Sequence, residues 1–208
     1  LNLYRWLVGL GPAGVSEESK RITQQAAMMM DVNNALDHAP PQGWRCYNDE
    51  GARAAGSSNL ALGYRSAADS VDGYMEDSGV PSLGHRRWCI FPQLDDVGFG
   101  HRGRGGAMQV FNRNNAAMPE FVAYPAPGPF PSEAIRGVWS FSAPRLGATA
   151  VTITEESSGE QLPADVTLLQ ANFGLDTVAI NPGFTPVVGE TYRLEVSSGG
   201  QQWAYETT

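Results

Sequence analysis

The chain has 208 residues, of which 42% are hydrophobic, and its net charge is −8. This length and apolar content suffice for one large domain, or for a medium domain followed by a small one. The acidic balance argues against nucleic acid as the main partner, because phosphate binding needs a basic surface, and it disfavours anionic membranes. No apolar run approaches the ~20 residues of a membrane span, so we expect no transmembrane segment.

The first third of the chain has helical signals. Residues 1–10 place apolar side chains at helical spacing and predict a short amphipathic helix. Ser16 fits the N-cap of a second helix, with Glu17 and Glu18 favourably placed in its first turn. We interpret the run Met28–Met30 within this helix as core packing rather than part of a cofactor site.

Two segments with different signals follow. Residues 48–63 are rich in Gly, Ala, Ser and Asn and predict loop or short turns. Ser66 fits the N-cap of another helix, whose inner face would carry Val71 and Tyr74. Pro81 marks the end of this helical region.

From residue 86 the pattern changes to short β-type runs separated by Gly, Pro and Asn. We expect a strand to begin directly after His85. Arg86 and Arg87 would then alternate, one facing a cleft and the other facing solvent. The glycine-rich basic cluster at residues 101–106 is interpreted as a turn rather than an anion site.

The proline-rich segment 125–131, "PAPGPFP", predicts a domain boundary. Helices and a first set of strands precede it, in a domain of residues 1–127. The alternating runs in residues 128–208 predict a small all-β sandwich of immunoglobulin-like type. The expected fold class is therefore α+β, with a helix-and-sheet domain followed by a β-sandwich module.

The chain has two cysteines, Cys46 and Cys89, whose pairing depends on whether the protein is secreted or cytosolic. In a secreted protein two cysteines usually pair, whereas in a cytosolic protein they are usually inert thiols. Lys20 is the one lysine of the chain, and Gly and Pro are abundant, which fits a secreted protein. We therefore expect a Cys46–Cys89 disulfide.

Three histidines are candidates for chemistry: His38, His85 and His101. A Cys46–Cys89 bridge would draw together the segments that carry His38 and His85, so the two could share a cleft. Two imidazoles and a carboxylate can bind zinc or another divalent ion. Two hydrogen-bonded histidines under a loop are the alternative, and spacing alone leaves it open.

Five segments, in order, resemble one family over about the first 125 residues. They are "LNLYRWLVGLGPAG", "ALDHAPP", "SSNLALG", "SVDGYMEDSG" and "LGHRRW". Their order and spacing resemble the CAP superfamily of cysteine-rich secretory proteins, antigen 5 and plant pathogenesis-related proteins, in the form of its bacterial branch. The resemblance implies a CAP-type α-β-α sandwich in a secreted or cell-surface protein.

The resemblance also implies a central cleft with two histidines and two glutamates. Carried over, the histidines are His38 and His85, and some members of the family bind a divalent metal through them. Ser58 and Asp77 stand where the family has its glutamates. A serine cannot act unaided as a general base, and Asp77 reaches less far than a glutamate. These departures weaken a catalytic role more than metal binding by His38 and His85.

We therefore expect a non-enzymatic extracellular module that binds a small ligand, an ion or a surface partner. The resemblance adds lipids to the ligand classes. A divalent-metal-dependent hydrolase of protease type, with Asp77 as its base, is the alternative. A structural or adhesive protein with a vestigial cleft is the third hypothesis.

Overall fold

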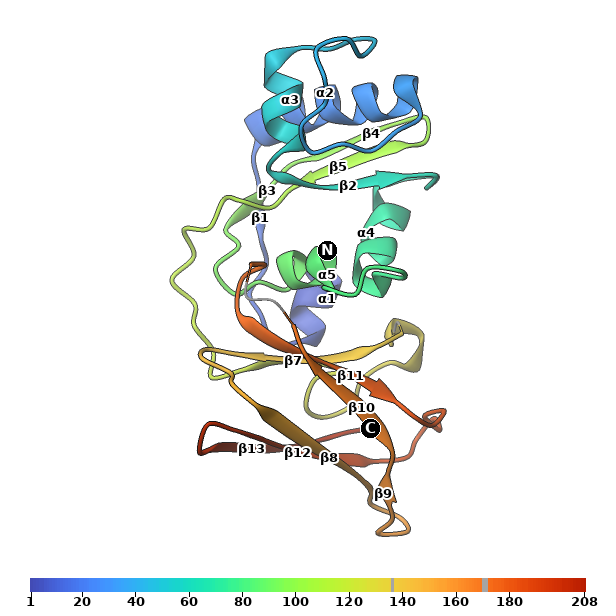
Figure 1. Ribbon diagram of the computed structural model, residues 1–208, viewed down its shortest axis with the longest axis vertical. Coiled ribbons are helices and arrows are strands. Elements are labelled where there is room, and N and C mark those ends of the chain that lie inside the picture. Colours follow the sequence, from blue (N-terminus) through green and yellow to red (C-terminus); the bar gives the residue numbers. More distant parts are fainter. Residues whose placement is uncertain (136, 170–171) are drawn as a thin grey trace. The chain divides into compact units, whose positions relative to one another are not determined.

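The computed structural model describes residues 1–135, 137–169 and 172–208, which form a mixed structure of helices and strands (Figure 1). This agrees with the expected α+β class. The chain divides into two compact units: Unit 1 comprises residues 1–2, 11–77 and 92–117, and Unit 2 comprises residues 3–10, 78–91 and 118–208. Two short segments of the N-terminal half therefore belong with the C-terminal strands. The domain boundary expected after residue 127 stays a prediction.

Unit 1 contains three helices and two small sheets. Strands β2, β5 and β4 form an antiparallel sheet in that order, and β1 pairs with β3 in parallel. The elements are β1 (Gly14–Val15), α2 (Glu17–Asn33), α3 (Asp49–Ala55), β2 (Ser58–Leu62), α4 (Ala67–Glu76), β3 (Asp96–Val97), β4 (Phe99–Arg102) and β5 (Gly105–Gln109).

The two predicted N-caps of Unit 1 are confirmed. The Ser16 side chain accepts a hydrogen bond from the Ser19 N–H at the start of α2, and Ser66 accepts one from the Asp69 N–H at the start of α4. Such caps satisfy backbone donors that have no partner inside the helix. Met29 and Met30 are fully buried, as expected of core residues.

The prediction of a loop at residues 48–63 is wrong, because the segment forms α3 and β2. Asn48 caps α3 by accepting a hydrogen bond from the Gly51 N–H. A Cβ at Gly51 would lie 2.9 Å from the Cβ of Gln25 on α2. The small residues that resemble a loop composition therefore allow α3 to pack closely against α2.

Unit 1 has three layers, with α2 and α4 on opposite faces of the β2-β5-β4 sheet. A Cβ at Gly105 would lie 2.3 Å from the Ala27 carbonyl oxygen of α2, whereas one at Gly106 would lie 2.9 Å from the Ser70 Oγ of α4. Successive residues of a strand face opposite sides of a sheet. The cluster at residues 101–106 is therefore a turn only at residues 103–104, and its outer residues belong to β4 and β5.

Unit 2 contains two short helices and a β-sandwich. Its two four-stranded antiparallel sheets have the orders β10-β11-β7-β6 and β13-β12-β8-β9. The elements are α1 (Asn2–Leu7, whose residues 3–7 belong to this unit), α5 (Gly84–Cys89), β6 (Val122–Tyr124), the 3₁₀ turn η1 (Ser132–Ala134), β7 (Trp139–Ala143), β8 (Thr149–Glu155), β9 (Gln161–Leu162), β10 (Ala164–Leu168), β11 (Asp176–Pro182), β12 (Tyr192–Ser198) and β13 (Gln201–Thr207).

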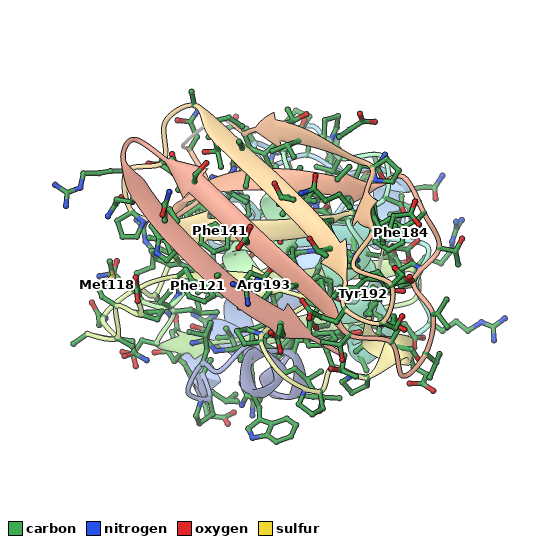
Figure 2. All side chains as sticks on the ribbon, turned by 90° about the horizontal axis from the view of Figure 1, so that it is seen from below. Met118, Phe121, Phe141, Phe184, Tyr192 and Arg193 are labelled. Atoms are coloured by element: carbon green, nitrogen blue, oxygen red, sulfur yellow. The ribbon has the colours of Figure 1, made fainter. Side chains whose placement is uncertain are left out.

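The two sheets of Unit 2 share one apolar core. Val178 of one sheet and Leu194 of the other are fully buried in it. Phe141 stacks on Phe121 with ring centroids 5.0 Å apart, and both are labelled in Figure 2. This shared core makes the C-terminal strands a β-sandwich, as the alternating runs predict.

The prediction of a strand from residue 86 is wrong, because this segment is the helix α5. The helix follows Leu83, which has a left-handed backbone and makes no capping hydrogen bond through its side chain. A Cβ at Gly84 would lie 3.0 Å from the Phe173 ring. Close tertiary packing, rather than a local start signal, therefore places α5.

Arg86 and Arg87 are both buried, so the expectation that one of them faces solvent is wrong. The Arg86 guanidinium donates a hydrogen bond to the Val138 carbonyl and lies 4.6 Å from the centroid of the Tyr124 ring. The Arg87 Nη2 donates to the Leu175 carbonyl at 2.8 Å. Both side chains thus connect α5 to the residues that precede β7 and β11.

Arg5 of α1 binds the other end of α5. Its Nη1 donates to the carbonyl oxygens of Cys89, at 3.2 Å, and Phe91, at 2.8 Å. The Arg5 side chain is fully buried, and this burial lowers the pKa of its guanidinium. Backbone carbonyls at the end of a short helix thus receive their hydrogen bonds from a buried cation.

The predicted Cys46–Cys89 disulfide is absent from the structure, in which both residues are thiols. Cys46 is exposed, whereas Cys89 is fully buried in α5. Among the described residues, no helix is both long and apolar enough to cross a membrane.

The two thiols should differ in reactivity. We expect an aromatic disulfide reagent to modify Cys46 in the folded protein and Cys89 only after unfolding, because only Cys46 is exposed. Counting the reacted thiols with and without denaturant checks this. Finding no thiol in the denatured, unreduced protein would restore the disulfide.

The Arg5 contacts should contribute substantially to stability. We expect Arg5→Met to lower the free energy of unfolding by about 3 kcal/mol, because it leaves two carbonyls without their charged donor. Denaturant titration measures the loss. Arg193→Met is the control, since Arg193 is partly exposed and pairs only with surface carboxylates. Equal effects of the two substitutions would contradict the role given to Arg5.

Candidate functional site

His38 lies in the segment after α2 and is exposed. Its Nδ1 lies 2.8 Å from the Ala55 carbonyl oxygen, at the end of α3. A carbonyl oxygen only accepts, so Nδ1 carries a proton, and in the neutral ring Nε2 is the unprotonated nitrogen. Metal-binding histidines commonly have this arrangement, in which the second nitrogen donates to a carbonyl.

The turn between α3 and β2 holds the His38 segment. A Cβ at Gly56 would lie 3.2 Å from the His38 carbonyl oxygen, so the two backbones are in close contact. Two residues after Gly56 the chain enters β2 at Ser58. The segment that was predicted to be a loop therefore positions one site residue and carries the next.

Ser58 is buried at the start of β2, opposite Gln109 of β5. Its hydroxyl makes a long hydrogen bond of 3.5 Å to the Gln109 Oε1, which also accepts a 2.8 Å hydrogen bond from the Ser57 hydroxyl. Ser58 is the donor here, because an amide oxygen only accepts. The residue expected at the cleft therefore brings a hydroxyl and no carboxylate.

Asp77 is buried, but it caps α4 instead of extending it. Its backbone is left-handed, with φ 54°, and its N–H donates to the Gly73 carbonyl. One turn earlier in α4, the hydroxyl group of the buried Tyr74 donates a 3.0 Å hydrogen bond to the Asn59 carbonyl oxygen. Tyr74 is thus a core residue, as expected, and it connects α4 to the strand that carries Ser58.

His85 is the second residue of α5 and is partly buried. It belongs to Unit 2, whereas His38, Ser58 and Asp77 belong to Unit 1. Arg86 and Arg87 follow it directly and fix its helix to the sandwich. The cleft shared by the four residues stays a prediction.

The expected metal site would need ligands beyond His38 and His85. Within the described ranges of the chain, no three or more His, Cys, Asp or Glu side chains form a group that could hold a metal ion. Zinc centres in proteins usually have three or four such ligands. Metal binding through His38 and His85 stays a prediction, and His38 has the tautomer that a metal ligand needs.

Sequence reasoning missed the buried polar residues around these positions. Gln109 accepts a hydrogen bond from Ser58, and the Asn59 carbonyl accepts one from the Tyr74 hydroxyl. The burial of Arg5 and the shared burial of Arg86 and Arg87 were not predicted either. One signal was available for two of them: Arg86 and Arg87 directly precede the apolar run "WCIF".

Two histidines should show opposite neutral tautomers. We expect neutral His38 to carry its proton on Nδ1, and neutral His101 to carry it on Nε2, because Nε2 of His101 lies 3.2 Å from the Tyr64 carbonyl oxygen. Long-range ¹H–¹⁵N NMR of the imidazole rings distinguishes the two forms. An Nε2-protonated His38 would contradict the contact with Ala55.

Comparison with known proteins bears on the N-terminal part of the chain. The model of the CAP family, described as the cysteine-rich secretory protein family, matches residues 1–111, slightly more than half of the chain. The matched range includes His38, Ser58, Asp77 and His85. No curated protein and no solved structure matches the chain. The family match, together with the order of the five segments, shows that this chain belongs to the CAP family.

Proposed function

We propose that this CAP-family chain is an extracellular interaction module that binds a small ligand or a partner and does not catalyse a reaction. His38 and His85 would be the polar groups of its cleft. Ser58 and Asp77 would shape the cleft without supplying the acid–base pair of the family's tetrad. Secretion, which is common among CAP proteins, is part of this proposal.

The hydrogen bonding of Ser58 carries the proposal. A general base must take a proton at neutral pH, and a carboxylate or an imidazole can do so. The Ser58 hydroxyl is buried, and it donates a long hydrogen bond to the Gln109 amide oxygen instead of accepting a proton. Chemistry that needs two acids and two histidines would therefore lack one of its acids.

A hydrolase that uses a divalent metal is the second candidate. The contact of His38 with Ala55 favours it, because Nε2 is then the nitrogen that could bind a metal or accept a proton. Two imidazoles alone would leave such an ion mostly hydrated, so we expect weak binding. Asp77 would have to act as the base from a left-handed helix cap.

The β-sandwich would present the CAP domain or bind a partner of its own. Two four-stranded antiparallel sheets around one core support an immunoglobulin-like module. Such sandwiches serve many unrelated roles, so the architecture does not identify the partner. Because α5 is bonded to residues of this module, a partner bound there would act on the helix that carries His85.

The proposal is tested by NMR on the whole chain, with the three histidine rings as reporters. A sterol, a fatty acid and zinc chloride are titrated separately. We expect at least one of the two lipids to shift the His38 and His85 signals in a saturable way and to leave the His101 signal in place. His101 is the internal control because it lies outside the proposed cleft.

The same samples separate the two candidate functions. Casein hydrolysis is measured with zinc present, for the wild type and for Asp77→Ala. The proposal expects no hydrolysis above buffer in either protein. Zinc-dependent hydrolysis that Asp77→Ala abolishes would replace the proposal with the hydrolase. If no lipid shifted either ring, the cleft would be vestigial and the proposed ligand binding wrong.

A further inference from the structure

One end of the β-sandwich contains a pocket of about 310 Å³, which no part of the proposed function uses. It lies where β12 begins and β13 ends, and Tyr192, labelled in Figure 2, is at this end. The segment at residues 130–135 and the loop at residues 186–190 complete its wall. The volume is at the lower end of the range for small-molecule pockets.

Three of the residues that line the pocket are aromatic. Phe130, Trp139 and Tyr192 all line it, and the rings of Trp139 and Tyr192 meet at 64° with centroids 6.2 Å apart. Organic cations are attracted to the electron-rich faces of aromatic rings. The Trp139 Nε1 is also buried without a hydrogen-bond partner among the described residues, which is unusual for an indole in a folded protein.

The charged residues that the structure describes at the pocket are acidic. Glu133 and Glu190 line it, and the lining residues that the structure describes include no Lys, Arg or His. The Glu190 carboxylate accepts hydrogen bonds from the N–H groups of Ser157 and Thr191. The hydrogen bond from the Ser157 side chain lowers the pKa of Glu190 most, and the bonds from the two backbone groups lower it further, against a smaller opposing effect of desolvation.

The mouth of the pocket has exposed apolar side chains. Val187 and Val188 line the pocket, and 63% and 81% of their surfaces are exposed. The Tyr192 hydroxyl accepts a 2.9 Å hydrogen bond from the Val187 N–H, which holds this loop against the aromatic wall. An apolar body in the pocket would cover both valines and remove their surface from water.

We propose that this pocket binds a small organic cation, in which an ammonium group is attached to an apolar aryl or alkyl body. The aromatic wall and the two valines would contact the body. Glu133 and Glu190 would attract the ammonium group. This inference is independent of the proposed function, because every lining residue belongs to Unit 2 and none belongs to the His38 and Ser58 site.

Three probes with one shared body test the charge requirement. The ¹⁵N-labelled whole chain is titrated with 2-phenylethylamine, 2-phenylethanol and phenylacetate, which are cationic, neutral and anionic. We expect saturable shifts of the amides at residues 187–190, with the amine binding about fivefold more tightly than the alcohol. Phenylacetate should bind most weakly. The absence of saturable shifts at these amides, or equal affinities for all three probes, would overturn the proposal.

A pair of lysine substitutions locates the site. Val188→Lys should weaken phenylethylamine binding about fivefold, because it places a positive charge at the mouth. Leu168→Lys is the matched control, since Leu168 is an exposed apolar residue of Unit 2 that does not line the pocket. Unchanged binding by Leu168→Lys supports the proposal. If both variants weakened phenylethylamine binding equally, the loss would come from the overall charge of the protein, and the proposal would be overturned.

Discussion

Buried hydrogen bonds from arginine side chains to backbone carbonyls join α1 and α5, which come early in the sequence, to the C-terminal strands of Unit 2. Arg5 contacts the end of α5, and Arg86 and Arg87 reach the residues before β7 and β11. A buried cation requires several acceptors, which only a completed fold supplies. The position of His85 therefore depends on strands that follow it by more than fifty residues.

This dependence explains what could be predicted from the sequence. Ser16 and Ser66 predict their helices because a capping hydrogen bond forms within a few residues of the sequence. The alternating runs after residue 138 predict strands for the same reason, since the alternation is local. The α5 segment has no such cap. Its composition favours a strand, but contacts with residues distant in the sequence, such as Phe173, stabilise a helix instead. α3 was missed because its small residues serve packing against α2, which composition alone does not reveal.

The candidate site divides in the same way. Family resemblance proposes His38, Ser58, Asp77 and His85 as candidates, but the hydrogen bonding of His38 and Ser58 follows from tertiary contacts. The Ala55 carbonyl sets the tautomer of His38, and the Gln109 amide oxygen accepts a hydrogen bond from the Ser58 hydroxyl. Asp77 ends α4 instead of lying along it. The expected disulfide is absent, and the spacing between Cys46 and Cys89 does not indicate that Cys89 is buried in α5.

Native-state hydrogen exchange at the Ile90 amide, which donates to the Arg86 carbonyl, tests the central claim that α5 is an integral part of Unit 2. If arginine contacts hold α5 to the sandwich, this amide should exchange with the same opening free energy as amides of β7 and β11. Exchange at the low free energy of a fraying helix would contradict the claim. His85 would then lie on a mobile segment, and the arginine contacts would not determine its position.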